Sequence, residues 1–242
     1  MSLITPQWTV PANVRAGSTT RRGGVSTAPW DSLNLGAHVG DDGQRVQENR
    51  QRLMQLADLP AMPVWLDQVH GTKVLLLDGD VPASLRADAV WTRQPGVVCA
   101  VMTADCLPVL FCSQDGTQVA AAHAGWRGLC AGVLEATLAA FTVPASEISC
   151  WLGPAIGPTA FEVGAEVREA FVSQHAGADA AFRPQGEKFT ADLWLLAKQR
   201  LQGAGVAQIF GGGDCTFNQP EQFFSFRRDG TTGRMASFIW LS

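Results

Sequence analysis

The sequence contains no tyrosine and only four histidines among its 242 residues. A multicopper oxidase holds one copper with two histidines and a separate copper cluster with many more. Four histidines in one subunit cannot supply both sites, and the lack of tyrosine removes a common redox relay. The composition therefore argues against a copper oxidase.

Strong charge of either sign is also missing. Charged residues make up 17% of the chain, the net charge is −4, and basic residues cluster only as the pairs Arg21-Arg22 and Arg227-Arg228. Nucleic acids and anionic membrane surfaces select strongly basic faces, so neither is an expected partner. The 46% hydrophobic content is that of a globular protein with ample core.

Long apolar runs and targeting features are absent as well. No run approaches the roughly 18 apolar residues of a membrane span, and the N-terminal segment lacks the charged and apolar regions of a signal peptide. The six cysteines lie mostly within apolar segments, which does not suggest a disulfide framework. We expect a cytoplasmic protein, a monomer or weak homo-oligomer, with no membrane partner.

The pattern of apolar runs and turn residues predicts more strands than helices, several of them in hairpins, which favours the α+β class over a doubly wound parallel sheet. No linker or low-complexity tract divides the chain, so residues 1–242 are expected to form a single domain. The expected strands cover residues 64–69, 73–77, 88–92, 97–102, 107–112, 119–122, 148–152, 206–210 and 235–241. The expected helices cover residues 42–57, 129–141, 164–175 and 191–202.

The central segment predicts a hairpin that brings two reactive side chains together. The runs 107–112 and 119–122 flank the turn signal Ser113-Gln114-Asp115-Gly116. In a regular hairpin closed by that turn, partner residue numbers sum to 229, which sets Cys106 beside His123 with Cβ atoms about 4.5–5.5 Å apart. A β-bulge would shift this register by one residue.

A thiol beside an imidazole has three common interpretations: a metal site, a Cys–His nucleophile pair, or a buried cysteine beside a hydrogen-bonded histidine. The segment Asp67–Gly71 adds His70 at the end of another apolar strand. His, Cys and His with an open fourth position is a usual arrangement for catalytic Zn²⁺. A fourth ligand from His38 or Cys215 would instead indicate a structural zinc module, although Cys215 is expected in the core.

Two glycine-rich segments are candidate anion sites. Arg21 and Arg22 lie beside a glycine pair, and Arg127 follows a glycine turn that leads into a helix. Backbone N–H groups and guanidinium groups together suit an anion. The alternatives are a solvated turn for the first segment and an Arg127–Asp105 ion pair for the second.

Seven ordered motifs, spread over nearly the whole chain, resemble those of the YfiH family, also called the laccase-domain or polyphenol oxidase family. They are Arg-x-Gly-Gly-Val-Ser (21–26), the loop 34–42, Asp-Gln-Val-His-Gly (67–71), Thr-Ala-Asp-Cys-Leu-Pro (103–108), His-Ala-Gly-Trp-Arg-Gly (123–128), Gly-Pro-Ala-Ile-Gly-Pro (153–158) and Phe-Phe-Ser-Phe-Arg-Arg-Asp-Gly (223–230). The resemblance implies one compact α+β domain of layered mixed and antiparallel sheets flanked by helices. It also implies a catalytic zinc centre held by His70, Cys106 and His123, where Cu²⁺ binding is plausible too.

The resemblance further implies a purine nucleoside phosphorylase that acts with phosphate on adenosine, inosine and S-methyl-5′-thioadenosine, with adenosine deaminase activity as well. By motif position, Arg22, His38, Gln68 and Arg127 are the expected substrate contacts, and Arg127 with Arg21 or Arg22 is the expected phosphate anchor. The family has also been labelled a copper laccase and a peptidoglycan-precursor editing factor. The second label corresponds to an amidase acting on UDP-MurNAc-L-Ser, with Cys106 as nucleophile and His123 as its base.

Overall fold

The computed structural model describes residues 3–79 and 82–242. Its strands are β1 Leu3–Ile4, β2 Val14–Thr19, β3 Val74–Leu76, β4 Ala89–Thr92, β5 Cys99–Thr103, β6 Leu107–Ser113, β7 Val119–Ala124, β8 Ile148–Leu152, β9 Glu162–Val163, β10 Phe182–Gln185, β11 Lys188–Ala191, β12 Gln208–Gly211 and β13 Met235–Leu241. Its helices are α1 Gly43–Leu56, α2 Trp126–Ala131, α3 Val133–Leu138, α4 Ala165–Val172, α5 Leu193–Gly203 and α6 Phe226–Asp229, with short 3₁₀ turns η1 Ala145–Glu147 and η2 Ala176–Ala181.

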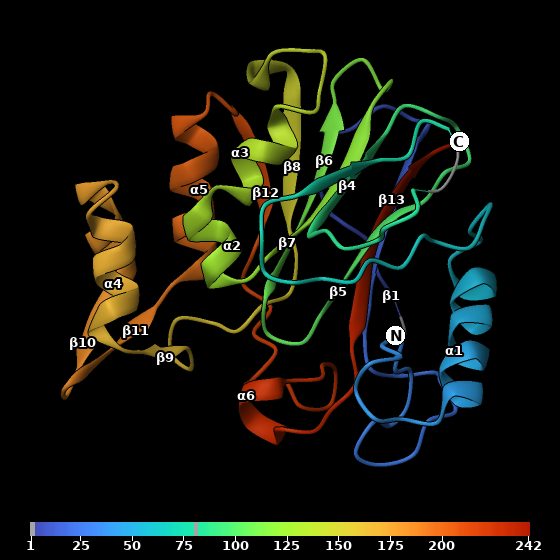
Figure 1. Ribbon diagram of the computed structural model, residues 1–242, viewed down its shortest axis with the longest axis horizontal. Helices are drawn as coiled ribbons and strands as arrows, with labels where there is room; N and C mark the ends of the chain where they lie inside the picture. The colour runs from blue at the N-terminus through green and yellow to red at the C-terminus, as the bar shows by residue number, and fades with distance from the viewer. Residues whose placement is uncertain (1–2, 80–81) are drawn as a thin grey trace.

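Two sheets packed face to face form the middle of the molecule (Figure 1). One has the strand order β12-β8-β6-β7-β4-β3, and the other has the order β1-β2-β13-β5. Most neighbours are antiparallel, whereas β3 pairs with β4 and β12 pairs with β8 in parallel. A small third sheet, β10-β11-β9, lies beside α4. This mixture confirms the predicted α+β class and its layered sheets.

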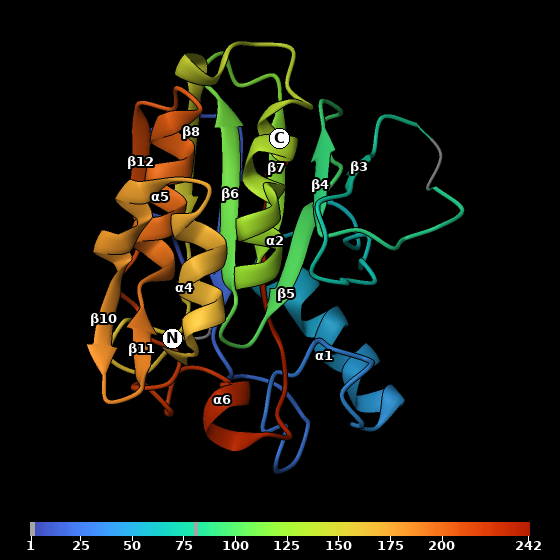
Figure 2. The same ribbon diagram turned by 60° about the vertical axis from the view of Figure 1, so that its left-hand side comes forward.

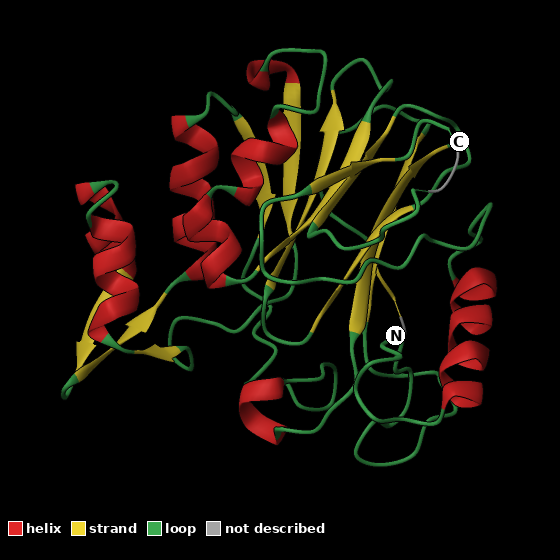
Figure 3. Cartoon of the chain, viewed as in Figure 1, coloured by secondary structure: helices red, strands yellow, loops and turns green. Residues whose placement is uncertain are grey.

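Helices cover both outer faces of the paired sheets, as Figure 3 shows by colour. Helices α2, α3 and α5 lie on the six-stranded sheet, with α2 over β6 and β7 in Figure 2, and α1 lies on the outer side of the four-stranded sheet. Among the described residues, no helix is both long and apolar enough to cross a membrane.

The period of two along each strand explains the layers. On β6, Leu107, Val109 and Phe111 pack toward the helices, whereas Leu110 and Cys112 pack toward the four-stranded sheet. The whole of β6 is buried, because both of its faces meet apolar neighbours. Strand β6 is thus a rigid support for the residues at its two ends.

The expected register of the β6–β7 hairpin is wrong by two residues. Leu107 pairs with Ala124 and Cys112 with Val119, so partner numbers sum to 231. The turn is longer than expected because the Asp115 carboxylate accepts hydrogen bonds from the Ser113 hydroxyl, at 2.6 Å, and from a backbone N–H two residues on. A shift of two preserves which face each side chain occupies.

The expected helices and strands are largely present, with local differences. The helix expected over 42–57 is α1, which begins after Asp42; the Asp42 side chain caps it, and its last residue, Leu56, is 45% exposed. The helix expected over 129–141 is split at Gly132, whose φ of 101° is left-handed. Residues 64–69 are expected to form a strand. The segment is instead irregular, with an isolated β-bridge at Asp67.

Candidate functional site

Three side chains from separate segments meet at one end of the central hairpin. His70 precedes β3, Cys106 lies at the corner between β5 and β6, and His123 lies near the end of β7. Their ligand atoms all lie within 4.8 Å of one another. Among the residues that the structure describes, this is the single cluster of histidine, cysteine and acidic side chains able to hold a metal ion.

The side chain of Asp88, fully buried, organises this cluster. Its Oδ1 lies 2.9 Å from Nδ1 of His123 and accepts a hydrogen bond from the backbone N–H of His70 at 2.8 Å. Its Oδ2 accepts from the N–H of Gly71 at 2.6 Å. One carboxylate therefore orients the His123 ring and fixes the loop that carries His70, whose φ of 60° is unusual for a residue other than glycine.

Gly125 provides the space in which the three side chains meet. Continuing the observed register one residue past the Leu107–Ala124 pair sets Gly125 against Cys106. A Cβ at Gly125 would lie 2.7 Å from Cδ2 of His70 and 3.0 Å from Sγ of Cys106. The thiol and the imidazoles can therefore come together only because Gly125 has no side chain. The two-residue shift in register is what places this glycine opposite Cys106.

The electrostatics of the cluster favour a thiolate. Burial by itself raises the pKa of Cys106, but His123 and His70 outweigh burial and lower that pKa to about 6. Burial lowers the pKa of His123, yet Cys106 and Asp88 together raise it to about 9. The thiolate is the form that binds metals and attacks electrophiles, so the cluster is prepared for either role.

The cluster opens into a cavity of about 260 Å³. The residues lining it are His38, Gln68, His70, Met102, Thr103, Ala104, Cys106, His123, Phe226 and Arg234. Of the predicted substrate contacts, His38 and Gln68 lie in this wall. Burial, reinforced by Arg234, lowers the pKa of His38. Gln68 has both ends of its amide bonded to the backbone of Met102, which makes it a brace between its loop and β5.

The two predicted arginine contacts lie elsewhere. Arg22 is bonded to the backbone carbonyl and the carboxylate of Glu221, and Arg127 is exposed with its guanidinium 4.4 Å from the centroid of the Trp126 ring. Neither belongs to the described lining of the cavity. The alternative pairing of Arg127 with Asp105 is wrong, because Asp105 accepts instead from Thr216 and the backbone N–H of Arg227.

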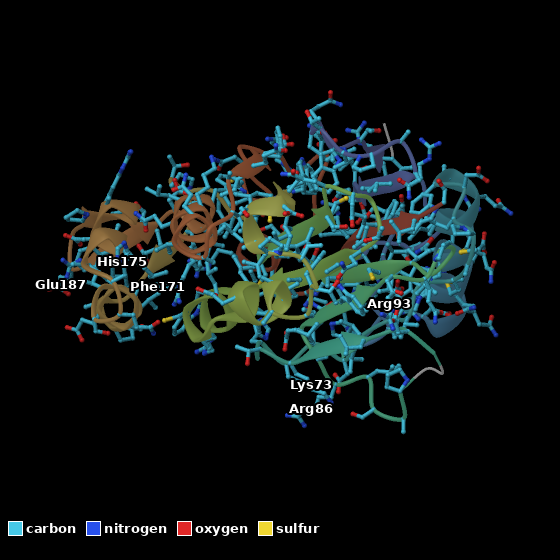
Figure 4. All side chains as sticks on the ribbon, turned by 90° about the horizontal axis from the view of Figure 1, so that it is seen from above. Lys73, Arg86, Arg93, Phe171, His175 and Glu187 are labelled. Carbon is cyan, nitrogen blue, oxygen red and sulfur yellow. The ribbon has the colours of Figure 1, made fainter. Side chains whose placement is uncertain are left out.

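Candidates for a fourth ligand are also placed. Cys215 is buried, and its sulfur accepts a hydrogen bond from the N–H of Gly157 at 3.2 Å, in keeping with the expected core position. His38 lines the cavity without joining the described cluster. The remaining histidine, His175, lies beside Phe171 at the α4 end of the molecule (Figure 4).

The donor set fits a metal ion. Sγ of Cys106 lies 3.8 Å from Nε2 of His70, close to the roughly 3.6 Å expected between a sulfur and a nitrogen bound tetrahedrally to one zinc. The contact between Nδ1 of His123 and Asp88 leaves Nε2 free, as in many zinc sites. Two histidines and a cysteine also occur in copper sites, so the donors alone do not select the metal.

Sequence reasoning missed several residues of the site: Asp88, Gly125, Phe226 and Arg234. Asp88 begins a predicted strand, and Gly125 lies in a predicted glycine turn. The role of each depends on which side chains the fold places next to it, and the sequence does not give that. Phe226 belongs to the motif 223–230, and its exposure of 58% is the signal that only the structure provides. Arg234 lies just before β13, far in sequence from the other site residues.

The fold and the site define a class: a layered α+β protein with a His–Cys–His cluster in the wall of a small cavity. A family model described as "Multi-copper polyphenol oxidoreductase laccase" matches residues 15–242. The chain is 63% identical to "Purine nucleoside phosphorylase YfiH" of Escherichia coli (strain K12), over 99% of this chain and 98% of that relative. It therefore belongs to the YfiH family.

Further relatives agree in sequence and fold. "Purine nucleoside phosphorylase PA4543" of Pseudomonas aeruginosa is 58% identical over 98% of both chains. The crystal structure of Neisseria meningitidis protein NMB0706 superposes with a TM-score of 0.94 at 49% identity and covers both chains completely. That of YlmD from Geobacillus stearothermophilus gives a TM-score of 0.86 at 32% identity, over 95% and 92% of the two chains.

Proposed function

We propose that this protein is a zinc-dependent purine nucleoside phosphorylase with His70, Cys106 and His123 as the metal ligands. The observation that carries the proposal is the convergence of these three donors, within 4.8 Å of one another, at the wall of a cavity. The names of close relatives, purine nucleoside phosphorylases at 58% to 63% identity, support the choice of reaction.

The proposed substrates are adenosine, inosine and S-methyl-5′-thioadenosine, each cleaved with phosphate to the free base and the (methylthio)ribose 1-phosphate. Phe226 offers the nucleoside an exposed aromatic face at this cavity. Purine rings stack well on such faces. The orientation of α6, which carries Phe226, is fixed by the 2.7 Å hydrogen bond from the N–H of Arg227 to Asp105, next to Cys106.

The chain's own groups prepare the centre for this chemistry. Asp88 holds His123 and the His70 loop in place before any ligand arrives. Burial lowers the pKa of His38 and so favours its neutral form in the cavity wall. Zn²⁺ bound at the three ligands would supply a Lewis acid beside the nucleoside, and the adenosine deaminase side activity that we propose would use it to activate water.

The test is to incubate zinc-loaded protein with adenosine, with and without phosphate, and to separate the products. We expect adenine and ribose 1-phosphate only when phosphate is present, and we expect their loss in Cys106→Ala. Inosine formed without phosphate would show that deamination dominates. No product under either condition would reject the purine nucleoside proposal.

A second candidate, an amidase with Cys106 as nucleophile and His123 as base, is favoured by the lowered pKa of Cys106. Alkylation by iodoacetamide separates the two. If the thiol is a zinc ligand, the loaded protein should resist alkylation and the chelated protein should react. The rate of the chelated protein should rise about tenfold per pH unit up to its pKa of about 6 and then level off, because the thiolate is the reactive form.

Equal alkylation rates with and without zinc, together with metal-independent hydrolysis of UDP-MurNAc-L-Ser, would favour the amidase. The same three donors also suit copper. Metal analysis of protein purified without added metal tests whether the bound ion is zinc or copper. The six free cysteine thiols support our further proposal that the protein works in the reducing environment of the cytoplasm.

A further inference from the structure

Arg234 is held rigidly in the wall of the cavity that contains His70, Cys106 and His123. Its backbone N–H donates to the Asn34 side chain at 2.9 Å. Its guanidinium Nη1 donates to the backbone carbonyls of Thr232, at 3.2 Å, and Gly233, at 3.0 Å. The guanidinium carbon lies 5.9 Å from the centroid of the Phe226 ring. The Arg234 side chain is therefore held in place, and its guanidinium uses only part of its hydrogen-bonding capacity within the protein.

Among the described residues, no carboxylate forms an ion pair with Arg234. Within the described part of the chain, arginines such as Arg200 and Arg228 form ion pairs with Glu135 and Asp229, whereas Arg234 forms none. Burial lowers the pKa of Arg234, while the nearby Cys106 and Asp105 raise it. Arg234 is thus partly desolvated, and the negative charges near it are not in direct contact with it. An anionic ligand bound directly to its guanidinium would relieve part of the desolvation cost.

The aliphatic part of the Arg234 side chain is positioned by the close approach of a second segment of the chain. A Cβ at Gly36 would lie 2.8 Å from Cγ of Arg234, so the loop 34–42 packs directly on it. The same loop carries His38, which also lines the cavity. Arg234 and His38 thus stand together, and a planar guanidinium with free donors suits an oxyanion with two oxygens exposed.

We propose that Arg234 binds inorganic phosphate, the second substrate, beside the His70–Cys106–His123 cluster. This inference rests on the phosphorylase function proposed above. It assigns the phosphate anchor to a residue other than Arg22, Arg21 and Arg127. In the reaction, a phosphate oxygen forms the bond to C1′ as the C1′–N9 bond breaks, and the purine leaves with that electron pair and takes a proton from solvent. Arg234 holds the attacking phosphate.

Steady-state kinetics with Arg234→Gln test the assignment. We expect the KM for phosphate to rise about ten- to a hundredfold, as for a lost charged hydrogen bond, while the KM for adenosine changes less than about twofold. Arg234→Lys should recover part of the loss, since it restores the charge without the fork. The matched control is Arg183→Gln, the same change at an exposed arginine on β10, which should leave both constants unchanged.

Calorimetric titration with phosphate alone separates this inference from the proposed function. Wild-type protein should bind phosphate without nucleoside, and Arg234→Gln should not. If phosphate binds through Arg234 but no nucleoside is cleaved, the phosphorylase proposal fails and the anion site stands. If phosphorolysis proceeds with an unchanged phosphate KM in Arg234→Gln and Arg234→Lys, or if Arg127→Gln alone raises that KM, the assignment is wrong.

Discussion

Two cysteines near opposite ends of strand β6 have opposite properties. Cys106, at the open end of the hairpin, has its pKa lowered to about 6 by two imidazoles in spite of burial. Cys112, near the closed end, has its pKa raised to about 12 by burial and by Asp115. The two residues are only six positions apart in the sequence. The neighbours that the fold supplies, rather than the residue type, decide which thiol is reactive.

The two ends also differ in how they are built. The closed end is local: a turn of a few residues satisfies its own polar groups, and Cys112 packs between the two sheets. The open end collects groups from distant segments, with Asp88 joining the His70 loop to β7. The closed end is therefore built for stability, and the open end carries the groups to which we assign the proposed chemistry.

The difference between the two ends predicts opposite consequences when each thiol is removed in turn. Cys106→Ala should lower zinc affinity by more than about a hundredfold, because even partners behind the ligands are worth 10- to 100-fold, and should abolish phosphorolysis. Cys112→Ala should lower the free energy of unfolding by about 1–2 kcal/mol through lost packing and leave zinc binding intact. Zinc titration and chemical denaturation of both variants measure this, and equal zinc affinities would contradict it.

A smaller effect is expected from a methyl group placed at the open end. Gly125→Ala adds a Cβ that would lie 2.7 Å from the His70 ring, although its φ of −63° suits any residue. The ligands should be forced apart, with zinc affinity falling about tenfold, a figure at the lower end of outer-partner effects.

Gly43→Ala is the matched control for Gly125→Ala, since nothing lies within 4 Å of a Cβ there. It should leave zinc affinity unchanged and stabilise α1 by up to about 1 kcal/mol. Unchanged zinc binding in Gly125→Ala would show that the His70 loop can yield, and that the missing side chain is not required for the cluster.

Local patterns were sufficient for much of the fold. The strands β8 and β13 and the capped helix α1 follow from apolar period and turn residues, because these signals depend on near neighbours in the chain. The hairpin itself was predictable, but its register was not. The choice between a two- and a four-residue turn depends on how the Asp115 carboxylate is used, and sequence alone does not specify this.

The residues of the site likewise divide into those that the sequence identifies and those that only the fold reveals. His70, Cys106 and His123 are rare residue types at strand ends, so they could be singled out before the structure was known, and the structure brings them together. Asp88 and Arg234 could not, because an acidic residue in a strand and an arginine before one are ordinary until the fold places them. The arginines near glycines, Arg22 and Arg127, were conspicuous in sequence but lie outside the cavity wall.

The smallest effect tests whether the two hairpin ends are independent. Asp115→Ala removes the acceptor for Ser113 and Thr117 and should lower the free energy of unfolding by about 1 kcal/mol. The hydrogen bond from Ser113 lowers the pKa of Asp115, so its stabilisation is complete above the unfolded pKa of about 4 and is lost as pH falls through the folded pKa. Wild type and variant should therefore converge in stability at low pH, while kcat/KM at neutral pH stays the same. Strand β6 is buried along its length and joins this turn to Cys106. A change in kcat/KM would therefore mean that the strand transmits the loss of the Asp115 hydrogen bonds to Cys106. The two ends of the hairpin would then not be independent.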